Sequence, residues 1–218
     1  MTMLEKMDAF FDARLEGYEE HMLTNIESAG EFYPFTAGCL PIAPGTRLLD
    51  LGCGTGLELN WYFALVPDAA VTGIDLAPGM LARLAAKFPD KNLTLIQGSY
   101  FELPLGTECY DAAVSVESAH HFTQAEKTRL YRKLHAALRS GGFFILTDYF
   151  AHEDAFEEFC FRELKRLRAE QNITDDAFYH YDTPLTLAHE IQALRDAGFS
   201  NVRVLGSWGA THTLKAEK

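Results

Sequence analysis

Apolar residues recur at two different periods along this chain. From Leu4 to Met22 they stand three or four positions apart, the spacing of one helix face, so an amphipathic helix that forms a cap is predicted there. The stretch 31–45 contains three prolines and several aromatic residues. It is predicted to be an irregular connection with a helical turn.

Beyond Gly45, short apolar runs alternate with helical patterns. The runs have the length and apolar character of strands that are covered on both faces, and they span 47–51, 70–74, 93–96, 112–116 and 143–147. Helices are predicted between them at 57–65, 78–87 and 124–139. Thr123 and Glu126 form a capping-box signature at the start of the third helix, and Gly141-Gly142 is expected to end it. This alternation predicts right-handed crossovers and a parallel sheet with helices on both faces.

The last third departs from this rhythm. A helix is predicted at 155–171, and a second one begins at Thr183-Pro184 and ends at Gly198. Two strands, 201–205 and 208–214, are predicted to form an antiparallel hairpin because only Gly206-Ser207 separates them.

Composition narrows the function classes. The 218 residues include 19 Lys plus Arg and 31 Asp plus Glu, so the net charge is −12. Such a chain repels phosphate backbones, which predicts that it acts on a small molecule rather than on a nucleic acid. Without a membrane-length apolar run or a signal peptide at the N-terminus, it is expected to be cytoplasmic, and a monomer or homodimer. The cysteines are too scattered for a disulfide framework or a zinc site, at Cys39, Cys53, Cys109 and Cys160.

A glycine-rich turn carries the most information. Gly52, Gly54 and Gly56 follow the first predicted strand, and Asp75 ends the next strand about 20 residues later, where a carboxylate can accept hydrogen bonds from a ribose. A dinucleotide fingerprint would place its third glycine at Leu57. Asp50, expected at the rim of the turn, would repel a pyrophosphate but receive an ammonium group. These features predict a nucleoside ligand with a cationic tail.

The segment from Leu48 to Glu58 resembles motif I of the class I S-adenosylmethionine-dependent methyltransferases. The resemblance continues in order from Arg47 to Tyr149, and its motifs are specific as a set. Residues 71–81 are similar to the family's ribose-binding turn, 98–104 to its adenine-side loop, 110–122 to its fourth strand and the turn beneath the methyl group, and 138–145 to the hairpin before its fifth strand.

The resemblance implies a fold and a reaction. The fold would be a doubly wound, seven-stranded, mostly parallel α/β sheet of order 3-2-1-4-5-7-6, with strand 7 antiparallel, in one domain spanning 1–218. Within it, 1–44 would be a helical cap, 45–150 the cofactor-binding half, and 151–218 a helical insertion followed by the last strands. The reaction would be in-line methyl transfer from S-adenosylmethionine to a nucleophilic oxygen, nitrogen or carbon, with S-adenosylhomocysteine as product.

The resemblance also implies a set of site residues. The cofactor-binding residues expected are Tyr18, Asp50, Gly52, Cys53, Gly54, Gly56, Asp75, Leu76, Met80, Ser99, Tyr100 and Glu117. Family members usually carry Asp where this chain has Ser99, so the adenine pocket is expected in altered form. His121, with His120 as the alternative, is expected beside the transferred methyl group, where an imidazole can take a proton from the acceptor.

Several interpretations remain open at this stage. Asp148, Tyr149 and the segment 178–181 either line the acceptor site or pack as ordinary structure. No carboxylate and Asn set stands at an obvious spacing, so no metal is expected. Two other functions compete with catalysis, namely a non-catalytic S-adenosylmethionine-binding module and a nicotinamide-dependent oxidoreductase, the latter disfavoured by the glycine spacing.

Overall fold

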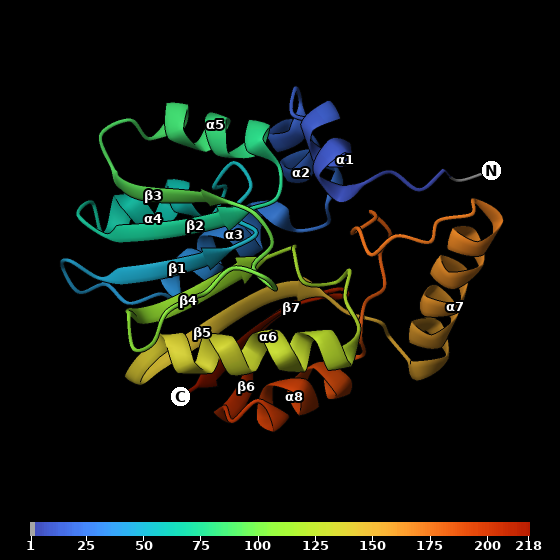
Figure 1. Ribbon diagram of the computed structural model, residues 1–218. Helices are drawn as coiled ribbons and strands as arrows, with labels where there is room; N and C mark the ends of the chain where they lie inside the picture. The colour runs from blue at the N-terminus through green and yellow to red at the C-terminus, as the bar shows by residue number, and fades with distance from the viewer. Residues whose placement is uncertain (1–2) are drawn as a thin grey trace.

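The computed structural model describes residues 3–218, which form a seven-stranded sheet with helices on both faces (Figure 1). The strands are β1 (Arg47–Leu51), β2 (Ala70–Asp75), β3 (Asn92–Gln97), β4 (Tyr110–Val116), β5 (Leu138–Tyr149), β6 (Ser200–Trp208) and β7 (Thr211–Glu217). Their order is β3-β2-β1-β4-β5-β7-β6. Strands β1 to β5 pair in parallel, while β7 is antiparallel to both of its neighbours. The expected sheet order and strand directions are therefore confirmed.

Neighbouring residues of a strand bury their side chains on opposite faces of the sheet. Leu48 packs with α3 (Ala29–Gly38), α4 (Leu59–Leu65) and α5 (Pro78–Lys87). Leu49 points to the other face, where α6 (Gln124–Ala137) and α8 (Leu187–Asp196) lie. Both faces are thus buried, as the continuous apolar runs require.

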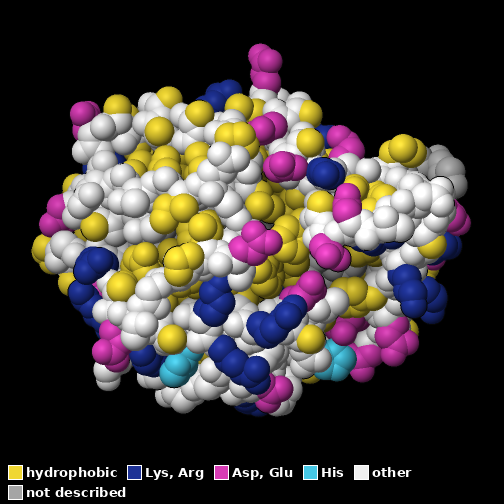
Figure 2. Space-filling model, in the orientation of Figure 1, with side chains coloured by type: hydrophobic (Ala, Val, Ile, Leu, Met, Phe, Trp, Pro, Cys, Tyr) yellow, Lys and Arg dark blue, Asp and Glu magenta, His cyan; other side chains and the backbone are white. Residues whose placement is uncertain are grey.

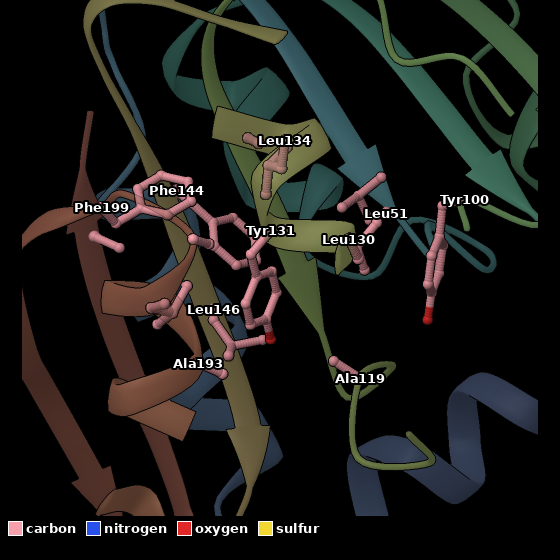
Figure 3. Packing of buried hydrophobic residues seen from close by; sticks show 14 of the residues in the cluster. Leu51, Tyr100, Ala119, Leu130, Tyr131, Leu134, Phe144, Leu146, Ala193 and Phe199 are labelled. Atoms are coloured by element: carbon pink, nitrogen blue, oxygen red, sulfur yellow. The ribbon is translucent and has the colours of Figure 1, made fainter. Parts of the chain in front are cut away.

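The core beneath α6 includes a buried polar contact. Figure 3 shows Tyr131 and Leu134 of α6 beside Phe144 and Leu146 of β5. The Tyr131 hydroxyl donates to Glu190 of α8, which also receives a hydrogen bond from buried Lys127 at 2.5 Å. The buried charges are therefore paired, which ties α6 to α8.

Three elements lie at the carboxyl ends of the strands or beside the sheet. Helices α1 (Met7–Ala13) and α2 (Tyr18–Asn25) lie near the ends of β1 and β2, and α7 (Asp154–Glu170) stands apart from the sheet (Figure 1). The Gly79 backbone N–H donates to Asp12 at 2.9 Å, which fastens α1 to the start of α5. Across residues 3–218, no helix has both the length and the apolar character needed to span a bilayer.

Two N-terminal predictions were wrong. The single helix predicted from Leu4 to Met22 is two helices, since α1 ends at Ala13 and Gly17, with a φ of +83°, caps the start of α2. The stretch predicted to be irregular contains α3, with Pro34 inside it. Burial of Phe32 and Tyr33 on the sheet outweighs the backbone hydrogen bond that proline removes.

Several later boundaries also differ. Helix α6 has the predicted capping box but ends at Ala137, and the glycine pair lies inside β5, where the pairing with β4 shifts register. Helix α8 begins at Leu187 with Thr186 as its cap, because the predicted start at Thr183-Pro184 is buried in extended chain. The last hairpin turns at Gly209, which adopts a φ of +57°, and not at 206–207.

Candidate functional site

The glycine turn between β1 and α4 is open on one side. Gly52, Gly54 and Gly56 all have positive φ, at 72°, 48° and 69°, a conformation that favours glycine. A Cβ at Gly54 would meet no atom within 4 Å, whereas one at Gly56 would lie 2.5 Å from a methyl of Leu84. Gly56 therefore permits close helix packing, and Gly54 leaves free space where a ligand can approach the backbone.

Asp75 at the end of β2 faces this turn. Its Oδ2 accepts from the Gly54 N–H and its Oδ1 from the Ala77 N–H, both at 2.8 Å. Burial raises the pKa of Asp75, and these two hydrogen bonds oppose the rise. Each oxygen keeps a lone pair, and Asp75 lines a pocket together with Leu76 and Met80, so it can still accept from a ribose diol.

The pocket over the glycine turn is narrow, with a volume of about 50 Å³. The buried Tyr100 ring closes one side, and its hydroxyl donates to the Ser118 carbonyl at 3.2 Å. Ser118 itself lies against Gly52, since its Oγ would be 1.9 Å from a Cβ there. Lys133 of α6 holds the Tyr100 loop by donating to the Tyr100, Phe101 and Leu103 carbonyls at 3.0, 2.7 and 2.8 Å.

Four expected cofactor residues do not line this pocket, namely Asp50, Cys53, Gly56 and Ser99. The expected rim position of Asp50 was wrong, because this side chain is 1% exposed and contacts Glu58. Burial raises the pKa of both carboxyl groups, and within residues 3–218 the Asp50 Oδ2 and Glu58 Oε1 atoms meet no hydrogen-bond partner at normal geometry. The Ser99 hydroxyl accepts from the Phe101 N–H at 3.2 Å, so it stabilises its own loop.

A much larger cavity of about 830 Å³ adjoins the first. Its wall comes from α1, α2, the turn after β4, the end of β5, the segment before α8 and the β6–β7 turn. The two cavities share Phe11, Tyr18, Glu117 and His121. A group held over the glycine turn would therefore be next to a molecule in the larger cavity.

Glu117 stands at this junction in an unusual backbone conformation. Its φ is +48°, although it is not a glycine, and such strain is concentrated at functional sites. Its carboxyl group receives a hydrogen bond from the Thr211 hydroxyl at 3.4 Å. Burial and the nearby Asp148 raise the pKa of Glu117 to about 8, so the protonated form predominates near neutral pH.

His120 and His121 follow Glu117 and differ in their surroundings. His120 Nδ1 lies 2.6 Å from the buried Asp148 carboxylate, whose other oxygen accepts from the Ala119 N–H at 2.9 Å. Burial lowers the pKa of His120, but Asp148, Asp182 and Glu117 together raise it to about 9. Asp148 at the end of β5 is thus brought to the site, and Tyr149 beside it lines the larger cavity.

His121 lies between the two cavities. Its Nδ1 is 3.2 Å from the Tyr181 carbonyl oxygen. Burial, with the positive charge of His120 as the next contribution, lowers the pKa of His121 well below its usual value. The expected position beside the cofactor turn therefore agrees with the cavity geometry, while the role of this residue remains a prediction.

The segment 178–181, which the sequence left open, closes the larger cavity, and sequence reasoning missed Asp182 beside it. His180 stacks on Phe10 at 3.5 Å between ring centroids, and the backbone N–H groups of Met7 and His180 pair the segment before α8 with α1. Asp182 reaches both histidines from this segment. The aromatic run at 178–181 was the one signal of this arrangement in the sequence.

Charges are unevenly placed on the surface. Figure 2 shows Lys and Arg side chains grouped over α6, with Asp and Glu side chains above them around α1 and α2. Among the described residues that line the larger cavity, Arg14 is the one Lys or Arg, and its guanidinium already pairs with Glu5 at 2.8 Å. The carboxyl groups in that lining are Glu16, Glu27, Glu117 and Asp182.

Comparisons with known proteins place this geometry in a family. Residues 48–142 match a family model described as a methyltransferase domain. A methyltransferase of Geobacillus thermodenitrificans, itself uncharacterised, is 28% identical over 201 residues, 92% of this chain and 88% of that protein. An uncharacterised methyltransferase of Synechocystis is 32% identical over 124 residues, and the match spans 57% of each protein.

A solved structure shows the same fold. Human N-acetylserotonin methyltransferase in complex with S-adenosylmethionine superposes with a TM-score of 0.67 and 17% sequence identity, over 97% of this chain and 56% of that one. The glycine turn, the sheet order and the matched domain agree with one another. Residues 48–142 therefore form a methyltransferase domain, and the sheet has the fold of the class I S-adenosylmethionine-dependent methyltransferases.

Proposed function

We propose that this protein transfers a methyl group from S-adenosylmethionine to a small molecule bound in the 830 Å³ cavity. The observation that carries the proposal is the junction of this cavity with the pocket over the glycine turn, where Tyr18, Glu117 and His121 belong to both. A volume of this size is in the range that small-molecule sites occupy.

The residues present fit the cofactor. Asp75 can bind the ribose, Gly54 offers free space above the backbone, and Leu76, Met80 and Tyr100 form an apolar wall for adenine. Tyr18 and Glu117 lie toward the larger cavity, where the methionine part would extend. Because 50 Å³ is too small for a nucleoside, we expect side chains that line this pocket to shift when it binds.

Bound S-adenosylmethionine supplies a methyl group that is already activated by a sulfonium. The task of the chain is then to align the acceptor, exclude water and manage one proton. We assign the acceptor's nucleophilic atom to the side of the junction lined by His120 and His121. His121 is the first candidate to contact that atom, and Asp148 fixes the ring orientation of His120.

Calorimetry with S-adenosylhomocysteine and with NAD tests the cofactor assignment. We expect binding of the first and none of the second. Methyl transfer from labelled S-adenosylmethionine to a small-molecule extract then tests catalysis, and His121→Ala should lower turnover at least about tenfold with little change in cofactor affinity. Tight cofactor binding without transfer to any acceptor would instead support a non-catalytic binding module.

A further inference from the structure

Three side chains at the junction between the two cavities face one another at separations longer than those of strong hydrogen bonds. His120, His121 and Asp182 each present a nitrogen or oxygen atom, and these three atoms all lie within 4.8 Å of one another. Asp182 Oδ1 is 3.6 Å from His120 Nε2 and 3.4 Å from His121 Nδ1. These separations are long for charge-assisted hydrogen bonds, which are about 2.7–2.9 Å.

The same separations suit a shared cation. Zinc binds imidazole nitrogen and carboxylate oxygen at about 2.0–2.2 Å, so adjacent ligand atoms of a tetrahedron lie about 3.3–3.5 Å apart. His121 Nδ1 is also hydrogen-bonded to the Tyr181 carbonyl oxygen at 3.2 Å, a contact that coordination of an ion by Nδ1 would replace. From these distances we infer that His120, His121 and Asp182 bind a divalent transition-metal ion, with Zn²⁺ as the expected species.

The surroundings of the three ligands support a built site. Asp148 accepts from His120 Nδ1 at 2.6 Å, which leaves Nε2 as the atom that faces Asp182. Metal-binding histidines usually have such an orienting carboxylate. The Thr183 N–H donates to the His120 carbonyl at 2.8 Å, so the backbone next to Asp182 is fixed against the histidine turn.

The charge balance of the junction also favours a cation. The carboxylates of Asp148 and Asp182 lie 2.6 and 3.6 Å from the two ring nitrogens of His120, and the guanidinium of Arg14 is already paired with Glu5. Asp182 is about half exposed on the cavity side, so an ion can enter through the 830 Å³ cavity. The sequence concealed this set because Asp182 stands about sixty residues after the two histidines.

This inference deepens the proposed function, since the ion would lie where the acceptor's nucleophilic atom is expected. A bound divalent ion lowers the pKa of a hydroxyl or thiol that coordinates it. His121 would then act on the acceptor through the metal. The inferred specificity is for acceptors with an oxygen or sulfur nucleophile that can coordinate the ion.

Zinc binding is measured on the full chain without an affinity tag, after treatment with EDTA, and in the absence of cofactor. Calorimetry with ZnCl₂ should give one site per chain, and Co²⁺ should give the visible absorption of a tetrahedral complex. Asp182→Asn should weaken zinc affinity at least about tenfold, and Asp148→Asn by about 10- to 100-fold through the orientation of His120. The Asp182 side chain is 47% exposed, so Asp182→Asn is expected to leave the fold intact, which thermal unfolding of the variant checks.

Two control variants separate this site from other surface carboxylates. Asp176→Asn removes an exposed carboxylate of the same segment and should leave zinc affinity unchanged. His189→Gln disrupts a separate group formed with Asp154 and Glu157, and it should also have no effect. Absence of zinc uptake, equal affinity in Asp182→Asn, or loss in His189→Gln alone would overturn the inference. None of these results bears on cofactor binding, which is tested separately.

Discussion

A side chain at Gly54 tests whether the open face of the glycine turn is the cofactor site. Gly54 has a φ of +48° and free space around its missing Cβ. Gly45, before β1, has a φ of +70° and equal free space, but it does not line the pocket. Asn is the non-glycine residue best suited to this backbone region, so Gly54→Asn and Gly45→Asn form a matched pair.

The magnitudes follow from this geometry. Both variants place a residue with a Cβ in left-handed backbone, which costs about 1–2 kcal/mol and lowers the Tm by roughly 2–8 °C for a chain of this size. In Gly54→Asn alone, the new side chain also enters the space in front of Asp75. Loss of one charge-assisted hydrogen bond to the ribose, about 1.5–3 kcal/mol, weakens binding by about 10- to 150-fold.

The assay is calorimetric titration of both variants with S-adenosylhomocysteine, accompanied by thermal unfolding. We expect similar losses of stability and a loss of affinity in Gly54→Asn only. Wild-type affinity in Gly54→Asn would refute the placement of the nucleoside over this turn. An equal loss of affinity in Gly45→Asn would show that the effect comes from general destabilisation.

Three further predictions concern groups around the same turn. Asp75→Asn should weaken S-adenosylhomocysteine binding by about 1–3 kcal/mol. It should also lower the Tm, because an amide cannot accept from both the Gly54 and Ala77 N–H groups as fully as the carboxylate does. A change in Tm alone would contradict the ribose role. Lys133→Met should raise the dissociation constant several-fold by releasing the Tyr100 loop, whereas exposed Arg129→Met should not, as titration of both variants will show. Asp50→Asn should stabilise the folded chain, and the gain should grow as pH rises above about 4. Burial raises the pKa of the Asp50 and Glu58 carboxyl groups in the folded state, so folding is disfavoured once these groups ionise in the unfolded chain. An equal gain in Tm at pH 5 and pH 8 would contradict this sign.

The parallel half of the fold could be predicted because its signals are local. Strand β1 and helix α5 have the predicted bounds, and the capping box at Thr123 forms with both of its hydrogen bonds. These elements depend on hydrophobic period and on residues within one turn of each other. The break between α1 and α2 and the helix around Pro34 depend instead on what each segment packs against, which a single sequence does not state.

The residues of the candidate site also divide into those with local sequence signals and those positioned by contacts between distant segments. Asp75 and Gly54 were identifiable because a βα turn brings residues of consecutive strands to one edge of the sheet. The position of Asp50 could not be predicted in the same way. The sequence places it beside the turn but does not reveal that its side chain is buried against Glu58. His180 and Asp182 reach the site through pairing with α1 and the histidine turn, contacts between segments far apart along the chain.

The match to a methyltransferase domain says little about which acceptor is methylated. The matched methyltransferase domain covers residues 48–142, which include the glycine turn, Asp75 and both histidines. The larger cavity takes most of its remaining wall from residues 10–27, 180–182 and 208–211, all outside that match. Those segments contribute the aromatic wall and Asp182, so they decide the shape and charge that an acceptor meets. We therefore expect acceptor preference to depend on these segments. Exchange of residues 21–27, which line the larger cavity but not the pocket over the glycine turn, should alter acceptor preference while cofactor affinity changes little.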